Sequence, residues 1–190
     1  MDMESDLKKL YAESKRIIKE ACLNKQLVVF VGAGASISSG MPSWSEAIAQ
    51  ISEHLELDSN TLCFNDFLRI PQYYYNARGK KEFTQFMHEI FHYKIHLEPS
   101  AIHDLIIQFG TQTIVTTNYD HLIELSAERN SEMIKVISKD SDLPYRKSER
   151  ELIKIHGDFE NDNFVLKEDD YLNYSRKFKL IENYITDIDH

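Results

Sequence analysis

The chain of 190 residues has the length of one domain and can bury a core without help from disulfides or a metal. With 42% hydrophobic and 28% charged residues it has the composition of a globular protein, and its apolar runs are shorter than a membrane span. The net charge of −9, without a Lys/Arg cluster, argues against direct nucleic-acid binding. Because the amino terminus is acidic and polar, unlike a secretory signal, we expect a cytoplasmic protein without a membrane anchor.

The first half of the chain begins with a helix and a strand. Residues 4–24 carry apolar side chains at helical spacing, which predicts an amphipathic opening helix. Residues 27–31 form an unbroken β-branched run, which is typical of a strand buried on both faces. Helical patterns then run to Phe109, so residues of about 45–109 are predicted to be a helical insertion. Its helices are expected at about 43–56, 61–96 and 100–109.

The second half of the chain alternates strands with helices. Four apolar runs are predicted to be strands, at 111–117, 133–138, 151–156 and, more briefly, 164–166. A helix is expected from Leu122, and residues 168–188 have a helical pattern. We therefore predict one α/β domain over residues 1–190: a Rossmann-like parallel sheet with helices on both faces and the insertion between its first two strands.

A glycine loop follows the first predicted strand. Gly32, Ala33, Gly34 and Ser36 lie where an open parallel sheet binds a dinucleotide, and glycines let the backbone approach a pyrophosphate. The dinucleotide fingerprint is incomplete, because Ile37 occupies the position of its third glycine. Taken alone, the loop is equally consistent with a tight turn.

Residues 88–92, His-Glu-Ile-Phe-His, spell the HExxH pattern of zinc proteases. On a helix the neighbouring apolar residues share one face, and His88, His92 and His96 fall on the opposite face, which turns to water. The longer metzincin pattern fails because Ile95 stands in place of its glycine. We predict surface histidines and no metal site.

Three motifs in sequence order resemble those of the sirtuin family. The loop GAGASISSGMPSW at 32–44 is similar to the sirtuin loop that begins GAGIS and closes SGIPDFR. TTNYD at 116–120 resembles the family's TQNID, and IHG at 155–157 resembles its catalytic HG. Each motif lies at the carboxyl end of a predicted strand, where such sheets bind ligands. The resemblance extends from about Leu27 to Tyr171.

The departures from the family are equally informative. Sirtuins carry a four-cysteine zinc ribbon after the HG, whereas this chain has no cysteine beyond Cys63, so the ribbon and its peptide cleft are absent. The arginine of the sirtuin loop is replaced by Ser45. What remains resembles the ribbon-less branch found in bacterial anti-phage systems. That resemblance implies an NAD+ hydrolase that takes NAD as its substrate, releases nicotinamide and ADP-ribose, and needs no metal.

The resemblance also implies roles for individual residues. Asn118 and His156 are the expected catalytic residues: the Asn118 amide orients the ribose and the attacking water, and neutral His156 accepts a proton. The residues expected to bind NAD are Gly32, Ala33, Gly34, Ser36, Thr117 and Asp120. Asp120 is also expected to hold the Asn118 turn. Helix capping by Asn118 and Asp120, and a core position for His156, remain the structural alternatives.

By the same resemblance, a further strand with a glycine-and-serine turn should follow the tail helix. We therefore expect the domain to be incomplete at its carboxyl end, a sensor or oligomerising region or a partner protein beyond it, and a homo-oligomer. Two other functions stay open. One is a non-catalytic module that senses NAD or ADP-ribose, and the other is an NAD-dependent protein deacylase.

Overall fold

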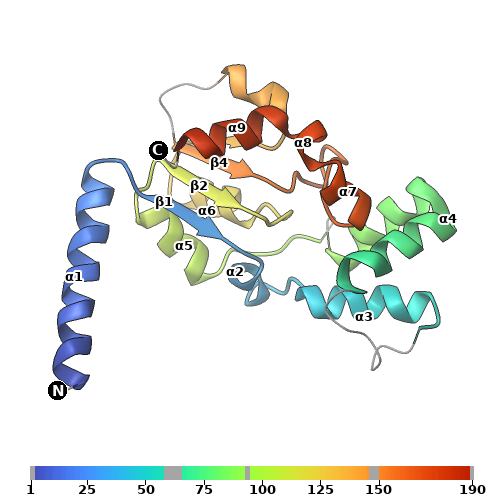
Figure 1. The fold of residues 1–190 in the computed structure, drawn as a ribbon, viewed down its shortest axis with the longest axis horizontal. Coiled ribbons are helices and arrows are strands. Elements are labelled where there is room, and N and C mark those ends of the chain that lie inside the picture. Colours follow the sequence, from blue (N-terminus) through green and yellow to red (C-terminus); the bar gives the residue numbers. More distant parts are fainter. Residues whose placement is uncertain (1–2, 58–65, 93–94, 146–149, 189–190) are drawn as a thin grey trace.

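Four parallel strands form the centre of the fold in the computed structural model, in the order β1-β2-β4-β3 (Figure 1). The structure describes residues 3–57, 66–92, 95–145 and 150–188. The strands are β1 (Val28–Val31), β2 (Thr113–Thr116), β3 (Ile134–Ile137) and β4 (Arg150–Lys154). The register pairs Val31 with Thr116 and Thr116 with Lys154, so the carboxyl ends of these strands lie at one edge. The predicted Rossmann-like parallel sheet is confirmed.

Helices cover both faces of the sheet, as predicted. Their bounds are α1 (Met3–Leu23), α2 (Gly34–Ile37), α3 (Trp44–His54), α4 (Asp66–Ile90), α5 (Ala101–Gln108), α6 (Leu122–Arg129), η2 (Asp140–Tyr145), α7 (Glu168–Leu172), α8 (Tyr174–Lys177) and α9 (Lys179–Ile188). Alternate strand residues enter separate clusters because successive side chains point to opposite faces. One cluster joins the sheet to α5 and α6 and includes Ile107, Ile114, Ile123 and Leu152. The other joins the sheet to α9 and includes Val115, Ile153 and Ile181.

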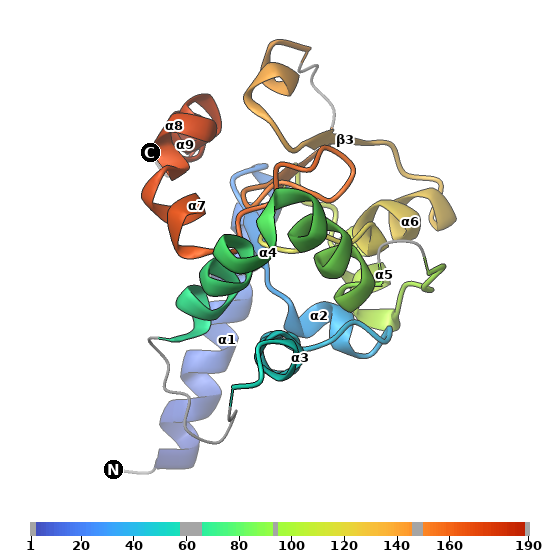
Figure 2. The ribbon, with the colours of Figure 1, turned by 90° about the vertical axis from the view of Figure 1, so that its right-hand side faces the viewer.

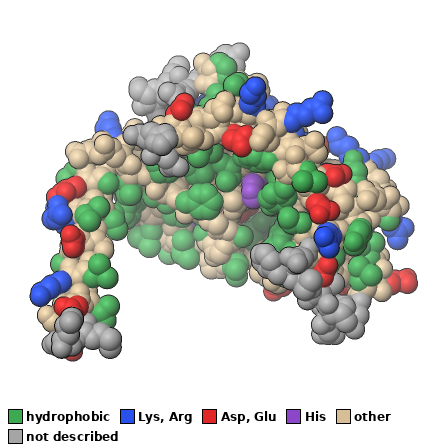
Figure 3. Space-filling view, in the orientation of Figure 1, with side chains coloured by type: hydrophobic (Ala, Val, Ile, Leu, Met, Phe, Trp, Pro, Cys, Tyr) green, Lys and Arg blue, Asp and Glu red, His purple; other side chains and the backbone are tan. Residues whose placement is uncertain are grey.

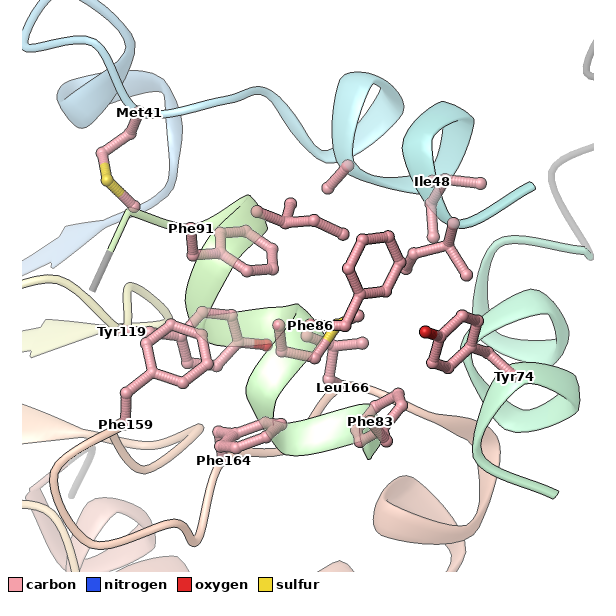
Figure 4. Close-up of a cluster of buried hydrophobic side chains, with 14 of the residues drawn as sticks. Met41, Ile48, Tyr74, Phe83, Phe86, Phe91, Tyr119, Phe159, Phe164 and Leu166 are labelled. Atoms are coloured by element: carbon pink, nitrogen blue, oxygen red, sulfur yellow. The ribbon is translucent and has the colours of Figure 1, made fainter. Parts of the chain in front are cut away.

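The helical insertion packs at the carboxyl edge of the sheet, with α4 in front of the strands in the view of Figure 2. The structure ends α4 at Ile90 and kinks it at Gly79, whose φ is 80°, so the continuous helix predicted over 61–96 is wrong. Residues 58–65 and 93–94 of that prediction lie outside the described ranges. A largely aromatic cluster joins the insertion to the residues that follow β2 and β4 (Figure 4). Within it, the rings of Phe91 and Tyr119 lie edge to face, 5.5 Å apart.

Two other predicted elements differ in the structure. Residues 164–166 form no strand; their side chains are buried, and the Val165 N–H donates to the His156 carbonyl. This run is apolar because it crosses the core. The helical tail is broken into α7, α8 and α9, since Asn173 and Phe178 leave helical backbone geometry. The Asp140 carboxylate then accepts hydrogen bonds from the backbone of the first turn of α9.

The opening helix α1 stands away from the sheet (Figure 1). Its apolar stripe includes side chains that are open to solvent, such as Leu10 and Tyr11. Hydrophobic side chains also gather on the hollowed face between α1 and the insertion (Figure 3). Within the described ranges, no helix combines the length and the apolar content needed to cross a bilayer.

Candidate functional site

The three motifs meet at a cavity at the carboxyl edge of the sheet. Its volume is about 230 Å³. The lining residues are Ala33, Ser36, Met41, Pro42, Trp44, Phe91, Thr117, Asn118, Tyr119, Asp120, His156 and Tyr171. The structure therefore brings together six of the eight residues that we expected at the site. The two exceptions are Gly32 and Gly34.

Ser36 connects the glycine loop to the residues that follow β2. Its side chain is buried, and its hydroxyl accepts a hydrogen bond from the Asn118 amide nitrogen (3.0 Å) and donates one to Asp120 Oδ2 (2.8 Å). His103 of α5 approaches the same hydroxyl, with Nε2 at 3.4 Å. The backbone N–H of Ser100 donates to Nδ1 of this ring, so a neutral His103 carries its proton on Nε2 and donates it to Ser36. Burial lowers the pKa of His103, which favours that neutral form.

Asn118 has its amide nitrogen occupied and its amide oxygen free. The residue is buried, and its backbone N–H donates to the Thr116 hydroxyl (3.0 Å), which itself donates to the Val31 carbonyl (3.0 Å). Asn118 Oδ1 has no hydrogen-bond partner in the described part of the chain. Buried polar atoms are nearly always hydrogen-bonded. This oxygen is therefore available to accept a hydrogen bond, and it belongs to a residue that lines the cavity.

Asp120 holds the turn that contains Asn118. Its Oδ1 accepts the backbone N–H of Leu122 (3.0 Å), the first residue of α6, while its Oδ2 accepts the Ser36 hydroxyl. The N-cap position of α6 is His121, so Asp120 binds the start of the helix from one residue before the cap. Thr117 lines the cavity and donates its backbone N–H to the Val31 carbonyl. Direct NAD binding by Thr117 and Asp120 stays a prediction.

His156 enters the cavity from the segment after β4. The ring lies between two tyrosines: Tyr119 is stacked at 6.5 Å and Tyr171 meets it edge to face at 5.5 Å. Burial lowers the pKa of His156 to about 4, so the imidazole is neutral at pH 7. A neutral imidazole can accept a proton, which is the state that the predicted base requires.

Gly157 fixes the turn that follows His156. Its φ is 69°, and a Cβ at this position would lie 2.8 Å from the Asn163 backbone oxygen and also overlap the Asn163 side chain. Asn163 cannot retreat freely, because its amide binds both the Asp158 N–H and the Ser138 carbonyl. Glycine is therefore required here for both conformation and space.

We expect Gly157→Ala to lower the free energy of unfolding by roughly 1–3 kcal/mol from backbone strain alone, with the clash adding to it. Chemical denaturation measures this loss. Gly79→Ala is the matched control, because Gly79 also has positive φ (80°) but a Cβ there would have no atom within 4 Å. Equal losses in the two variants would show that contact with Asn163 contributes nothing.

Gly32 and Gly34 lie beside the cavity without lining it. A Cβ on either glycine would meet no atom within 4 Å among the described residues, so a lack of space does not explain why these positions are glycine. Gly34 begins the single-turn helix α2. The open space beside the two glycines is what a bound phosphate group needs. Their role in binding NAD stays a prediction.

The HExxH histidines do not share a helical face. His92 follows the end of α4 and has a φ of 52°, while His88 remains within the helix. The prediction of a solvent-facing His88 is wrong, since only 20% of its side chain is exposed and its ring packs edge to face on Phe159. His96 is exposed. Among the residues that the structure describes, no group of three or more His, Cys, Asp or Glu side chains is placed to hold a metal ion.

Sequence reasoning missed two buried residues that support the site, His103 and Lys154. His103 contacts Ser36, which is 67 residues away in the sequence, so local spacing gives no signal for His103. A signal for Lys154 does exist: it is a lysine within the apolar run ELIKIH. A charged residue at the end of a strand buried on both faces requires specific partners.

Comparison with known proteins supports the motif resemblance. Residues 112–188, which include two of the three motifs, match the SIR2-like domain. Over these residues the chain is similar to sirtuins. It is 37% identical over 172 residues to defense-associated sirtuin 2 of Bacillus subtilis, covering 87% of this chain and 17% of that protein.

Two further relatives share one name. The chain is 32% identical over 160 residues to NAD(+) hydrolase ThsA of Bacillus cereus (strain MSX-D12), covering 82% of this chain and 33% of the relative. It is 33% identical over 146 residues to NAD(+) hydrolase ThsA of Cytobacillus dafuensis, covering 75% of this chain and 29% of the relative. The chain thus spans a third or less of the length of these three relatives.

Proposed function

We propose that the chain hydrolyses NAD+ to nicotinamide and ADP-ribose and acts as an NAD-depleting effector in anti-phage defence. The names of the relatives support this activity and this setting. The observation that carries the proposal is the content of one cavity. It holds a buried amide oxygen without a partner, on Asn118, together with the neutral imidazole of His156.

The reaction breaks the bond between nicotinamide and ribose and adds the elements of water. Nicotinamide departs as a neutral molecule, so positive charge develops on the ribose and catalysis depends on positioning and charge placement. Asn118 Oδ1 accepts a hydrogen bond from a ribose hydroxyl or from the attacking water. His156 takes the proton that the water loses when its oxygen bonds to the ribose.

The size of the cavity indicates that it holds only one part of NAD. At about 230 Å³ it is smaller than the roughly 300–1,000 Å³ of pockets that enclose a drug-sized ligand. We assign it the reacting end of NAD, with the phosphates along the open backbone of Gly32 and Gly34. A homo-oligomer and a downstream sensor region or partner protein stay predictions from the resemblance.

The decisive test measures nicotinamide release from NAD by the purified protein without any peptide. We expect turnover in the wild type and none above background in Asn118→Ala. Binding of NAD without turnover would instead indicate a sensor module. Turnover that requires an acylated peptide would indicate a deacylase.

A further inference from the structure

The fold buries a lysine completely beneath the candidate site. Lys154 is the last residue of β4, and its side chain has no exposed surface. Its ammonium donates a hydrogen bond to the backbone oxygen of Asp120 (2.7 Å) and pairs with the Glu124 carboxylate of α6 (2.6 Å). A buried cation is costly unless it is paired and hydrogen-bonded. Its two partners, both on the segment that follows β2, therefore indicate what this lysine does.

We propose that Lys154 is a positioning residue that sets the Asn118 turn relative to His156. The proposal rests on the proposed NAD hydrolysis for its kinetic consequence. Its structural part, that Lys154 orders the turn from Thr117 to Leu122, is independent of the reaction.

The position of Lys154 explains why this residue can serve both catalytic candidates. Its side chain holds the backbone of Asp120, two residues after Asn118. Its own carbonyl accepts the Gly157 N–H (3.0 Å), which closes the turn around His156. Lys154 thus binds the backbone close to both Asn118 and His156, the two groups that must face the same ribose.

The other contacts of the turn do not replace this bond. The Asp120 carboxylate binds Ser36 and the start of α6, and the Asn118 N–H binds Thr116 within the same segment. None of these contacts reaches β4, the strand that leads to His156, and the Tyr119 ring of the turn meets the His156 ring beyond the end of that strand. The Lys154 ammonium thus adds a side-chain hydrogen bond between the turn and β4 itself.

Glu124 makes the buried ammonium compatible with the reaction. Although burial raises the pKa of the Glu124 carboxyl, the Lys154 ammonium and the hydrogen bond with His121 lower it overall, so it is ionised at pH 7. The pair is neutral as a whole. Lys154 can thus anchor the turn without opposing the positive charge that develops on the ribose.

The test replaces both charges at once, with Lys154→Met/Glu124→Met. Replacing a buried ion pair by apolar side chains of similar length is often neutral for stability, so we expect a folded protein with a melting temperature close to that of the wild type. We expect kcat for NAD hydrolysis to fall about 10- to 100-fold, because a small displacement of positioning groups has effects of this size. Faster amide hydrogen exchange over residues 117–122 should accompany the loss.

Arg150→Met is the matched control at the other end of β4. Arg150 is also a largely buried cation that donates to backbone carbonyls, those of Thr111 (2.8 Å) and Ile107 (3.0 Å). Its loss should lower stability but leave kcat and the exchange of residues 117–122 unchanged. If Arg150→Met reduces kcat as much as the double variant does, Lys154 has no special positioning role.

Hydrogen exchange separates this proposal from the proposed function. If the wild type does not turn over NAD, the proposed function fails, and exchange of residues 117–122 alone decides the role of Lys154. Wild-type exchange in the folded double variant overturns the proposal, as does unchanged kcat in an active enzyme. Should the double variant fail to fold, Lys154→Met makes the same comparison, because it removes the bond to Asp120 while Glu124 keeps its contact with His121.

Discussion

Asn118→Asp should reduce NAD turnover by about 10²- to 10³-fold, the usual effect of removing one positioned polar group from an active site. The substitution keeps the shape of the side chain but removes its N–H donors. In the structure that amide donates to Ser36 Oγ, whose own proton is already given to Asp120. A carboxylate at position 118 therefore receives no hydrogen bond from Ser36. It also lies close to the negative charge of Asp120. Its repulsion from Asp120 should displace the side chain of residue 118, which lines the cavity.

Nicotinamide release under saturating NAD measures this effect, with Asn118→Ala beside it. Asn130→Ala is the matched control, since the Asn130 amide also donates to a side chain, that of Asp104 (3.1 Å), but does so at the far end of α6. The control should keep wild-type kcat. If Asn118→Asp turns over NAD at the wild-type rate, the amide does not position the reacting groups, and the proposed mechanism is wrong.

The parts of the fold that were predictable are those whose signal is local. Strands appear as unbroken apolar runs, so the four strands of the sheet could be located, although residues 164–166 show that an apolar run can cross a core without joining the sheet. The prediction that the first strand is buried on both faces is wrong, since Phe30 of β1 is 64% exposed. The kink at Gly79 was not predicted, because the apolar pattern continues on both sides of it. The start of α9 after the second break in the tail is held by Asp140, which is 40 residues before the Leu180 N–H that it binds.

The same distinction applies to the candidate site. Motifs at strand ends could place Asn118 and His156 together, since parallel strands end at one edge of a sheet. Two residues that support them, His103 and Lys154, could not be found in this way. His103 is 67 residues from its contact Ser36, and Lys154 is 34 residues from its contact Asp120. Only the packing of α5 and α6 against the sheet brings these polar groups together, and that packing depends on the whole fold.

His156→Ala should lower kcat by about 10²- to 10⁴-fold, the range expected for loss of a general base.

The structure also predicts how activity of the wild type depends on pH. Burial lowers the pKa of His156 to about 4 from its ordinary 6.5, so the ring stays able to accept a proton well below pH 6.5. The acidic limb of kcat/KM, which reports the free enzyme, should therefore be centred near pH 4. A limb centred near pH 6.5 would contradict the buried, neutral imidazole.

The same shift predicts how stability depends on pH. The unfolded chain binds a proton on His156 below about pH 6.5, whereas the folded chain does so only below about pH 4. Between these values the unfolded state binds more protons, so this residue makes the protein less stable as the pH falls from 6.5 to 4 and adds no further loss below that. Denaturation across this window should show a shallower decline for His156→Gln than for the wild type. His96→Gln, which changes an exposed histidine, should leave both the decline and the pH profile of kcat/KM unchanged, because its imidazole is 77% exposed and lies outside the cavity.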